Sequence, residues 1–379
     1  MSDPTNPPPI LGYGTNVHPA TSLDELKHNL RTHGTAVREQ LRQPTLPIGL
    51  WLPEPVALEL SENDNAKHFR EWLTNHHLEA FTLNGFPQYN FHQPVVKHAV
   101  YSPAWWEPAR LRHTKTLATL LVRLAPEYID ALSISTLPIG WRAQANDDRI
   151  DQAIKHLIQL SEYLEQLESQ TNRRITVDLE PEPGCCLDLA QHPVDLFDRL
   201  RTNGNPERIH RYLGVTHDTC HAAMMNENQT TVLNKYRDHQ IAVNKIQISS
   251  ALIANQESFA HLQHIHEPRY LHQTLIRSGA QSTFYDDLPE ALTHKAPIDE
   301  ARVHFHVPIF LDHVGQLTTT SHTIPDAITT ALSNGTTAFE VETYAWPQLP
   351  KDIWTHTLAA GIAEELRWAR NHFATITSP

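Results

Sequence analysis

The sequence predicts an α/β fold, a closed (β/α)8 barrel that occupies residues 1–379 as a single domain. Short β-like runs alternate with longer helical patterns along the chain, which is typical of a parallel sheet covered by helices. There are eight such runs, the number that closes a barrel. The 379 residues exceed the about 250 that this fold typically needs, which leaves a surplus for insertions and termini.

In chain order, the expected strands are Ile10–His18, Leu46–Leu52, Ala80–Asn84, Ala131–Leu137, Ile175–Glu180, Leu213–Asp218, Lys245–Ser250 and Ala338–Thr343. Among the helices between them, Ser22 and Glu25 form an S-x-x-E capping box. Apolar residues at helical spacing from Ile150 to Leu167, and again from Trp354 to Phe373, predict outer helices. The second of these would close the barrel after the last strand.

One long segment does not fit a minimal barrel. Residues 250–310 contain a strand-like piece, Arg269–Arg277, and a further β-like run, Val303–Phe310. We interpret this segment as an insertion before the last strand, placed as extended loops at the barrel mouth.

The composition is that of a globular protein, with 40% hydrophobic and 19% charged residues. The net charge is -13, and an acidic surface repels phosphate backbones, so we expect no nucleic-acid partner. Since no apolar run reaches about 18 residues, we expect no direct membrane insertion. Three cysteines make no disulfide framework, and Met1–Pro9 lacks the features of a secretory signal. We therefore expect a cytoplasmic protein.

The period of two in each strand separates an apolar side from a polar side. The apolar side must face the helices, so the polar side points into the barrel, where the carboxyl ends of the strands form the active sites of this fold. Carboxylates collect there, at Glu180, Asp218 and Glu342. Buried carboxylates repel one another and take up protons unless a cation is bound. We therefore expect a divalent metal site.

The sharpest local signal is the segment 214–221, in which Asp218 ends a strand and His221 follows in the first helical turn. This D-x-x-H arrangement at a strand-to-helix junction lets both side chains face the mouth. The alternative is that His221 is only a helix-start residue bonded to Asp218.

These motifs resemble those of the xylose isomerase-like barrel superfamily, which includes sugar isomerases and epimerases and endonuclease IV-like phosphoesterases. Nearly the whole chain resembles the metabolite traffic protein EboE family. The stretches that carry this resemblance are 12–18 (GYGTNVH), 81–87 (FTLNGFP), 133–138 (SISTLP), 179–184 (LEPEPG), 267–273 (EPRYLHQ) and 303–308 (VHFHVP).

The superfamily resemblance implies that Glu180, Asp218 and Glu342 are metal ligands. The superfamily usually adds a histidine on the seventh strand, where this chain has Gln247. His304 or His306 would replace it, and we favour His306. Three carboxylates and one imidazole suit one divalent ion, Mn²⁺, Mg²⁺, Fe²⁺ or Zn²⁺. A three-metal cluster of the endonuclease type is in doubt, because strands three and four offer Asn84 and Ser135 instead of histidines.

Further polar residues at the expected mouth are candidates for substrate binding. Asn16 and His18 would either contact substrate or brace a loop, and Arg269 or Arg142 would grip an anionic group or form an ordinary surface ion pair. Cys185 and Cys186 are expected to pack as small hydrophobic residues. The residues expected to bind substrate are Asn16, His18, Asn84, Gln247, Arg269 and His304.

We therefore expect an enzyme of isomerase or epimerase type, acting with a metal on a small polyhydroxylated, sugar-like or cyclitol-like substrate. The resemblance implies that Glu180 and Glu342 act as acid and base and that His221 orients substrate or Asp218. One alternative is metal-assisted phosphoester hydrolysis. Another is a metabolite-binding protein that hands its ligand to other proteins of a bacterial biosynthesis or traffic pathway, as the EboE resemblance implies.

Overall fold

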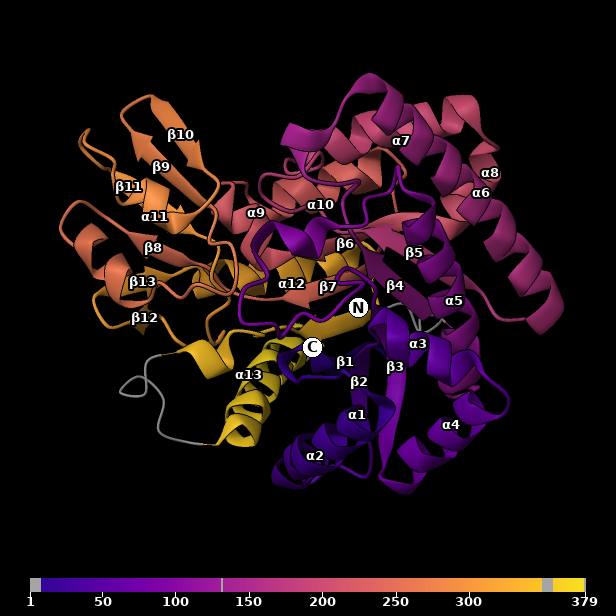
Figure 1. The fold of residues 1–379 in the computed structure, drawn as a ribbon. Coiled ribbons are helices and arrows are strands. Elements are labelled where there is room, and N and C mark those ends of the chain that lie inside the picture. The colour runs from indigo at the N-terminus through magenta and orange to yellow at the C-terminus, as the bar shows by residue number, and fades with distance from the viewer. Residues whose placement is uncertain (1–7, 131, 350–356, 378–379) are drawn as a thin grey trace.

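A computed structural model describes residues 8–130, 132–349 and 357–377, and it confirms the (β/α)8 barrel. Eight parallel strands close on themselves in the order β1-β14-β7-β6-β5-β4-β3-β2 (Figure 1). The barrel strands are β1 (Ile10–Gly14), β2 (Leu46–Trp51), β3 (Leu78–Asn84), β4 (Leu132–Thr136), β5 (Ile175–Leu179), β6 (Leu213–Asp218), β7 (Val243–Ile248) and β14 (Ala338–Val341).

The helices form an outer ring around these strands (Figure 1). They are α1 (Leu23–Asn29), α2 (Thr35–Leu41), α3 (Glu54–Ser61), α4 (Asn65–Asn75), α5 (Pro108–Leu124), α6 (Asp147–Thr171), α7 (Gln191–Asn203), α8 (Pro206–Tyr212), α9 (Thr219–Met224), α10 (Gln229–Asp238), α12 (Ile324–Ser333) and α13 (Leu358–Thr377). The expected apolar stripe of α6 is buried at Ile154, Leu157, Leu164 and Leu167. Ser22 caps α1 by accepting the Glu25 N–H at 3.2 Å. No helix in the described part of the chain is long and apolar enough to cross a membrane.

The first strand is shorter than the expected run Ile10–His18. It ends at Gly14, and Thr15–Val17 form a 3-10 helix. The turn occurs because the Thr15 hydroxyl, rather than a strand carbonyl, accepts the N–H of Trp51 at 3.0 Å. This early turn places Asn16 directly over the barrel mouth. The last expected strand also ends early, at Val341, so that Glu342 lies just beyond it.

The segment between β7 and α12 forms a second, antiparallel sheet beside the barrel (Figure 1, orange). It runs from Leu252 to Thr319 and carries the short helix α11 (Leu288–Ala291). Its strand order is β10-β9-β11-β8-β13-β12. The strands are β8 (Leu252–Ala254), β9 (Thr274–Ser278), β10 (Gln281–Tyr285), β11 (Glu300–Val303), β12 (His313–Val314) and β13 (Leu317–Thr319).

Two expected strands of the insertion were placed wrongly. Of the run Val303–Phe310, only Val303 belongs to a strand; the chain then leaves the sheet toward the barrel, where the Val307 N–H donates to the Ser250 carbonyl at 3.0 Å. Of the run Arg269–Arg277, only the part from Thr274 is in β9. Residues 267–270 form a turn instead, because the Glu267 carboxylate accepts two backbone N–H groups within it.

The closing helix α13 begins at Leu358, so Trp354 of the expected stripe lies outside the described residues. Ile362, Leu366 and Ala369 are buried as expected. The same helix carries a buried carboxylate, Glu365, which accepts hydrogen bonds from Thr343 Oγ1 at 2.5 Å, Trp346 Nε1 at 2.8 Å and the Ile309 N–H at 3.2 Å. Glu365 thus ties together the two segments that follow His306 and Glu342.

Burial raises the pKa of Glu365 from 4.5 to about 7, in spite of these three donors. The folded state therefore holds this proton more tightly than the unfolded chain, and stability falls as the pH rises through this range. A pKa difference of about 2.5 corresponds to about 3 kcal/mol. We expect the free energy of unfolding of the wild type, relative to Glu365→Gln, to fall by about this amount between pH 5 and pH 8 in urea titrations. The exposed neighbour Glu364→Gln is the control, and identical pH profiles for wild type and Glu365→Gln would contradict the expectation.

Candidate metal centre

Three carboxylates meet at the carboxyl end of the barrel, each from the end of a different strand. Glu180 follows β5, Asp218 ends β6 and Glu342 follows β14. One oxygen of each lies within 4.8 Å of the others, and all three side chains are buried. The period-two pattern of the strands therefore brings together the residues that it predicted as inward-facing.

Burial and mutual repulsion shift the pKa values of these carboxylates. Burial, followed by the charges of Glu342 and Asp218, raises the pKa of Glu180 well above its usual value. Burial and Asp218 raise the pKa of Glu342 to about 8. Burial alone would also raise the pKa of Asp218, but His221, His306 and a hydrogen bond from Ser249 hold it below the usual value. Burial and mutual repulsion therefore favour protonation of the two glutamates over protonation of Asp218.

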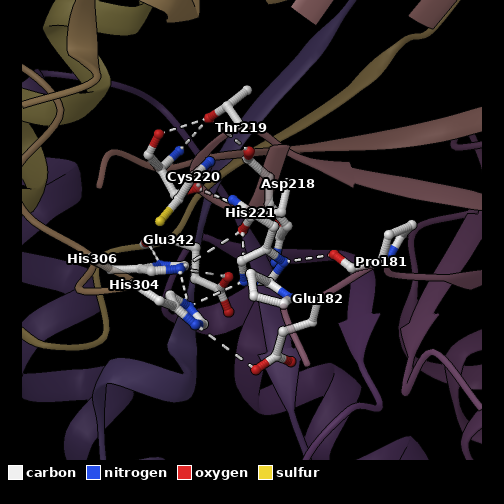
Figure 2. A network of polar contacts seen from close by, with 12 residues as sticks. Pro181, Glu182, Asp218, Thr219, Cys220, His221, His304, His306 and Glu342 are labelled. Carbon is white, nitrogen blue, oxygen red and sulfur yellow. Dashed lines mark hydrogen bonds and ion pairs between the residues drawn. The ribbon is translucent and has the colours of Figure 1, made fainter. Parts of the chain in front are cut away.

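Three histidines lie against this cluster and point toward one another (Figure 2). His304 Nε2 lies 3.2 Å from both His221 Nε2 and His306 Nε2. Asp218 Oδ2 faces the same space, 3.9 Å from His221 Nε2 and 4.0 Å from His306 Nε2. Asp218, His221 and His306 form a second ligand group, which shares Asp218 with the three carboxylates.

Hydrogen bonds at Nδ1 fix the tautomers of all three histidines. His221 Nδ1 donates to the Pro181 carbonyl at 2.8 Å, and His306 Nδ1 to the Glu342 carbonyl at 2.7 Å. His304 Nδ1 donates to the Gln273 amide oxygen at 2.8 Å. Burial lowers the pKa of His304 well below its usual value and that of His306 to about 4, so both are neutral. The Nε2 atoms of His304 and His306 therefore each present a lone pair, in the arrangement typical of metal-binding histidines.

Several buried polar atoms of the cluster have no hydrogen-bond partner in the described chain, and they suit a divalent cation. Glu180 Oε2 and Asp218 Oδ2 are buried and have no hydrogen-bond partner within the described chain. The same holds for both amide atoms of Gln247, which lies beside Asp218 in the register of β6 and β7. Buried polar atoms without partners are costly, and a cation would satisfy the oxygens. Carboxylates and imidazoles are its ordinary ligands.

The asparagines expected to bind substrate contact Glu342 instead. Asn16 Nδ2 and Asn84 Nδ2 donate to the same oxygen, Glu342 Oε1, at 2.6 and 3.0 Å. Both also line the pocket, so contact with a substrate stays a prediction. His18 lies behind Asn16, where its ring stacks on His33 with centroids 4.6 Å apart, and it is not part of the pocket lining.

The two arginine candidates lie away from the cluster. Arg142 pairs with Asp188 and donates to the Cys185 carbonyl. The guanidinium of Arg269 lies 5.9 Å from the ring of Tyr270 and does not line the pocket. Burial raises the pKa of Cys185 well above its usual value, which is consistent with the expected packing role.

Several contributors to the site were not foreseen from the sequence. Glu182 Oε1 accepts from Tyr101 Oη at 2.5 Å and from Gln273 Nε2 at 3.2 Å, and Gln273 in turn orients His304. Glu182 does lie on the polar side of its segment, so the period of two was a signal. Cys220, buried next to Asp218, groups with His304 and His306 as a further set of possible ligands.

A small pocket, with a cavity volume of about 60 Å³, opens onto the cluster. Its polar floor includes Glu180, Glu342 and the three histidines. No protein-family model and no curated protein matches the chain. Solved structures do match, most of those compared over nearly the full length of both chains. The chain has the xylose isomerase-like barrel fold.

Three of these structures illustrate the similarity. A xylose isomerase-like TIM barrel protein from Mycobacterium smegmatis, in complex with magnesium, has a TM-score of 0.55 at 13% identity and covers 100% of each chain. A D-tagatose 3-epimerase-like protein has a TM-score of 0.54 at 11% identity, covering 97% of this chain and 98% of its own. An L-ribulose 3-epimerase has a TM-score of 0.50 at 11% identity, covering 98% of this chain and 99% of its own. At these identities the similarity is one of fold.

Inside this xylose isomerase-like barrel, one ion pair lies on the inward side of the strands that carry the carboxylates. Lys245 Nζ donates to Glu340 Oε2 at 2.6 Å and to Ser135 Oγ at 3.2 Å, and both charged side chains are fully buried. Although burial alone would lower the pKa of Lys245, Glu340 and Glu180 raise it above the usual value. Lys245 is therefore a permanent cation among the acids.

We expect Lys245→Met to reduce the free energy of unfolding by about 3–5 kcal/mol, because Glu340 would then be a buried charge without a partner. The double variant Lys245→Met/Glu340→Leu removes both charges and should recover most of this loss. Urea unfolding at pH 7 measures both effects. A loss below about 1 kcal/mol in the single variant would show that the pair is not an important constraint.

Proposed function

We propose that the protein is a divalent-metal-dependent enzyme of isomerase or epimerase type, acting on a small polyhydroxylated, sugar-like or cyclitol-like metabolite. The convergence of Glu180, Asp218 and Glu342, with unpartnered oxygens at the floor of a pocket, is the observation that carries this proposal. Glu180, Asp218, Glu342 and His306 would hold the ion, whether Mn²⁺, Mg²⁺, Fe²⁺ or Zn²⁺.

When bound, the ion would supply Lewis acidity to adjacent hydroxyl and carbonyl oxygens of the substrate, making the neighbouring C–H more acidic. The chain's own residues would then move the proton. Glu180 and Glu342 come from different strands and both line the pocket, so one can remove a proton from carbon while the other returns one. The amides of Asn16 and Asn84, both bonded to Glu342 Oε1, fix the orientation of that carboxylate.

His221 would orient the substrate or Asp218. Its backbone N–H donates to Asp218 Oδ1 at 2.9 Å, its Nδ1 is held by the Pro181 carbonyl, and its Nε2 faces the pocket. The names of the epimerase-type structures that share the fold support a sugar-like substrate. The EboE resemblance supports a place in a bacterial metabolite biosynthesis or traffic pathway, with other proteins of that pathway as partners. The three cysteines, too few for a disulfide framework, support a cytoplasmic location.

A second candidate function is metal-assisted hydrolysis of a phosphoester. The histidine group favours it, because Asp218 and His221 can hold a second ion next to the first, with the single free nitrogen of His306 bound to one of the two ions. Paired metals are common in such enzymes. Two ions per chain together with phosphate release from bis(p-nitrophenyl) phosphate would favour this function. Tight metabolite binding without turnover would favour a binding protein instead.

Metal content is the first test of the proposal. We expect purified protein, incubated with each ion and desalted, to retain Mn, Fe, Zn or Mg at about one or two ions per chain by elemental analysis. Asp218→Asn should lose the metal, since Asp218 belongs to both ligand groups, and Glu342→Gln should lose at least one ion. Asp178→Asn is the matched control, because it removes a buried carboxylate of β5 that belongs to neither group. An unchanged metal content in Asp218→Asn would exclude this centre.

Proton exchange tests the chemistry. The metal-loaded enzyme should exchange a substrate C–H for deuterium in D2O when ketoses and cyclitol ketones are screened by proton NMR. Replacing Glu180 by Gln should slow this exchange by about 10²–10⁴-fold, the usual contribution of a general acid or base. Full exchange activity in Glu180→Gln would contradict its assignment as acid or base.

A further inference from the structure

The pocket above the carboxylates has a roof of a different chemical character from its floor. The roof comes from the loop after β3 and from residues 267–273 of the insertion, and the two are bonded to each other. The N–H groups of Val96 and Lys97 both donate to the Arg269 carbonyl, at 2.7 and 2.9 Å. The insertion therefore supplies part of the cover over the candidate metal centre.

Three aromatic rings form one wall of the pocket. Phe91 lies 4.7 Å from Tyr270 and 5.3 Å from Tyr344, and Tyr270 lies 5.0 Å from Tyr344, measured between ring centroids. Tyr344 also lies 4.6 Å from the ring of His306, so the aromatic wall continues down to the ligands of the metal. We call these three residues, Phe91, Tyr270 and Tyr344, the aromatic wall. The hydroxyl of Tyr270 is buried without a hydrogen-bond partner in the described chain.

The roof offers little to an anionic group. The one Lys or Arg among the described lining residues, Lys97, is already paired with Asp287 at 2.6 Å. The floor is acidic, Arg142 is paired with Asp188, and Arg269, whose guanidinium lies 5.9 Å from the ring of Tyr270, does not line the pocket. A phosphate placed in this pocket would therefore meet carboxylates with no unpaired Lys or Arg among the described lining residues.

We propose that the substrate is uncharged and carries a flat, unsaturated or aryl group against the aromatic wall, with its adjacent oxygens directed toward Glu180 and Glu342. This inference rests on the proposed function, because it uses the carboxylate centre to place the oxygens. Stacked or edge-to-face packing on Phe91, Tyr270 and Tyr344 would stabilise the flat group. Tyr270 Oη would supply one hydrogen bond to a polar substituent on it.

Three probes that share one chelating head test this substrate class. All three are α-hydroxy ketones with the same HOCH2–C=O group. They differ in the group on the other side of the carbonyl, which is phenyl in 2-hydroxyacetophenone, methyl in hydroxyacetone and phosphorylated in dihydroxyacetone phosphate. Their affinities for Mn²⁺-loaded protein are measured by the paramagnetic broadening of their proton NMR signals. We expect the phenyl probe to bind about 10- to 100-fold more tightly than the methyl probe, since its ring is removed from water. The phosphate probe should show no gain over the methyl probe.

Substitutions test whether the aromatic wall causes the preference for the phenyl probe. Phe91→Ala should weaken the phenyl probe about tenfold and the methyl probe less than twofold. Phe259→Ala, a buried aromatic that lines a different cleft of the insertion, is the control and should change neither. The comparison of probes on the wild-type protein stands even where Phe91→Ala does not fold.

The outcomes separate this inference from the proposed function. If Mn²⁺ binds but the phenyl and methyl probes differ by less than twofold, or if the phosphate probe binds most tightly, the aryl inference is overturned and the metal proposal stands. If the protein binds no Mn²⁺ while titration calorimetry still shows preference for the phenyl probe, the aryl inference is supported and the metal proposal fails.

Discussion

The concentration of buried negative charge inside one barrel is the constraint on which the rest of the structure depends. Glu340 has its own cation, Lys245, at 2.6 Å. At the mouth, Asp218 and Glu342 accept hydrogen bonds from a hydroxyl, a backbone N–H and two amides, and Lys245 influences Glu180 and Glu342 only at longer range. Burial, together with the charges of the neighbouring carboxylates, therefore raises the pKa values of the two glutamates. Lys245 thus pairs with one acid inside the barrel, whereas the carboxylates at the mouth are suited to an added cation.

The sequence was sufficient for the barrel and for its inward carboxylates, because both depend on local periodicity. A period of two decides which residues face inward, and strand ends decide which of them reach the mouth. The positions of the histidines were harder to predict. His304 and His306 were correctly placed on a common side, but the strand assigned to them does not exist beyond Val303. Their meeting with His221 depends on how the insertion folds back over the barrel, and no local pattern encodes that distance.

The hydrogen-bond partners within the site also could not be predicted from the sequence. Asn16 and Asn84 are predicted to bind substrate, and the sequence did not show that both also donate to one oxygen of Glu342. The 3-10 turn that brings Asn16 there follows from a side-chain bond of Thr15, which competes with the strand ladder. The insertion also depends on contacts between distant parts of the chain. It supplies His304, a candidate ligand, Gln273, which orients His304, and Tyr270 of the pocket roof.

The two ends of the centre differ in the cations that they favour. At one end, the amide of Gln247 lies beside the carboxylate cluster, and neither of its amide atoms has a hydrogen-bond partner in the described chain. The carboxylate oxygens at this end suit hard ions such as Mg²⁺ and Mn²⁺. At the other end, His221, His304 and His306 present three imidazole nitrogens with Cys220 nearby, a donor set that suits Zn²⁺. Asp218 belongs to both ligand groups: one of its oxygens accepts from Ser249, and the other has no hydrogen-bond partner in the described chain and lies 3.9 Å from His221 Nε2. The softer donors therefore include His304 and His306 of the insertion, and His306 lies next to Tyr344 of the aromatic wall.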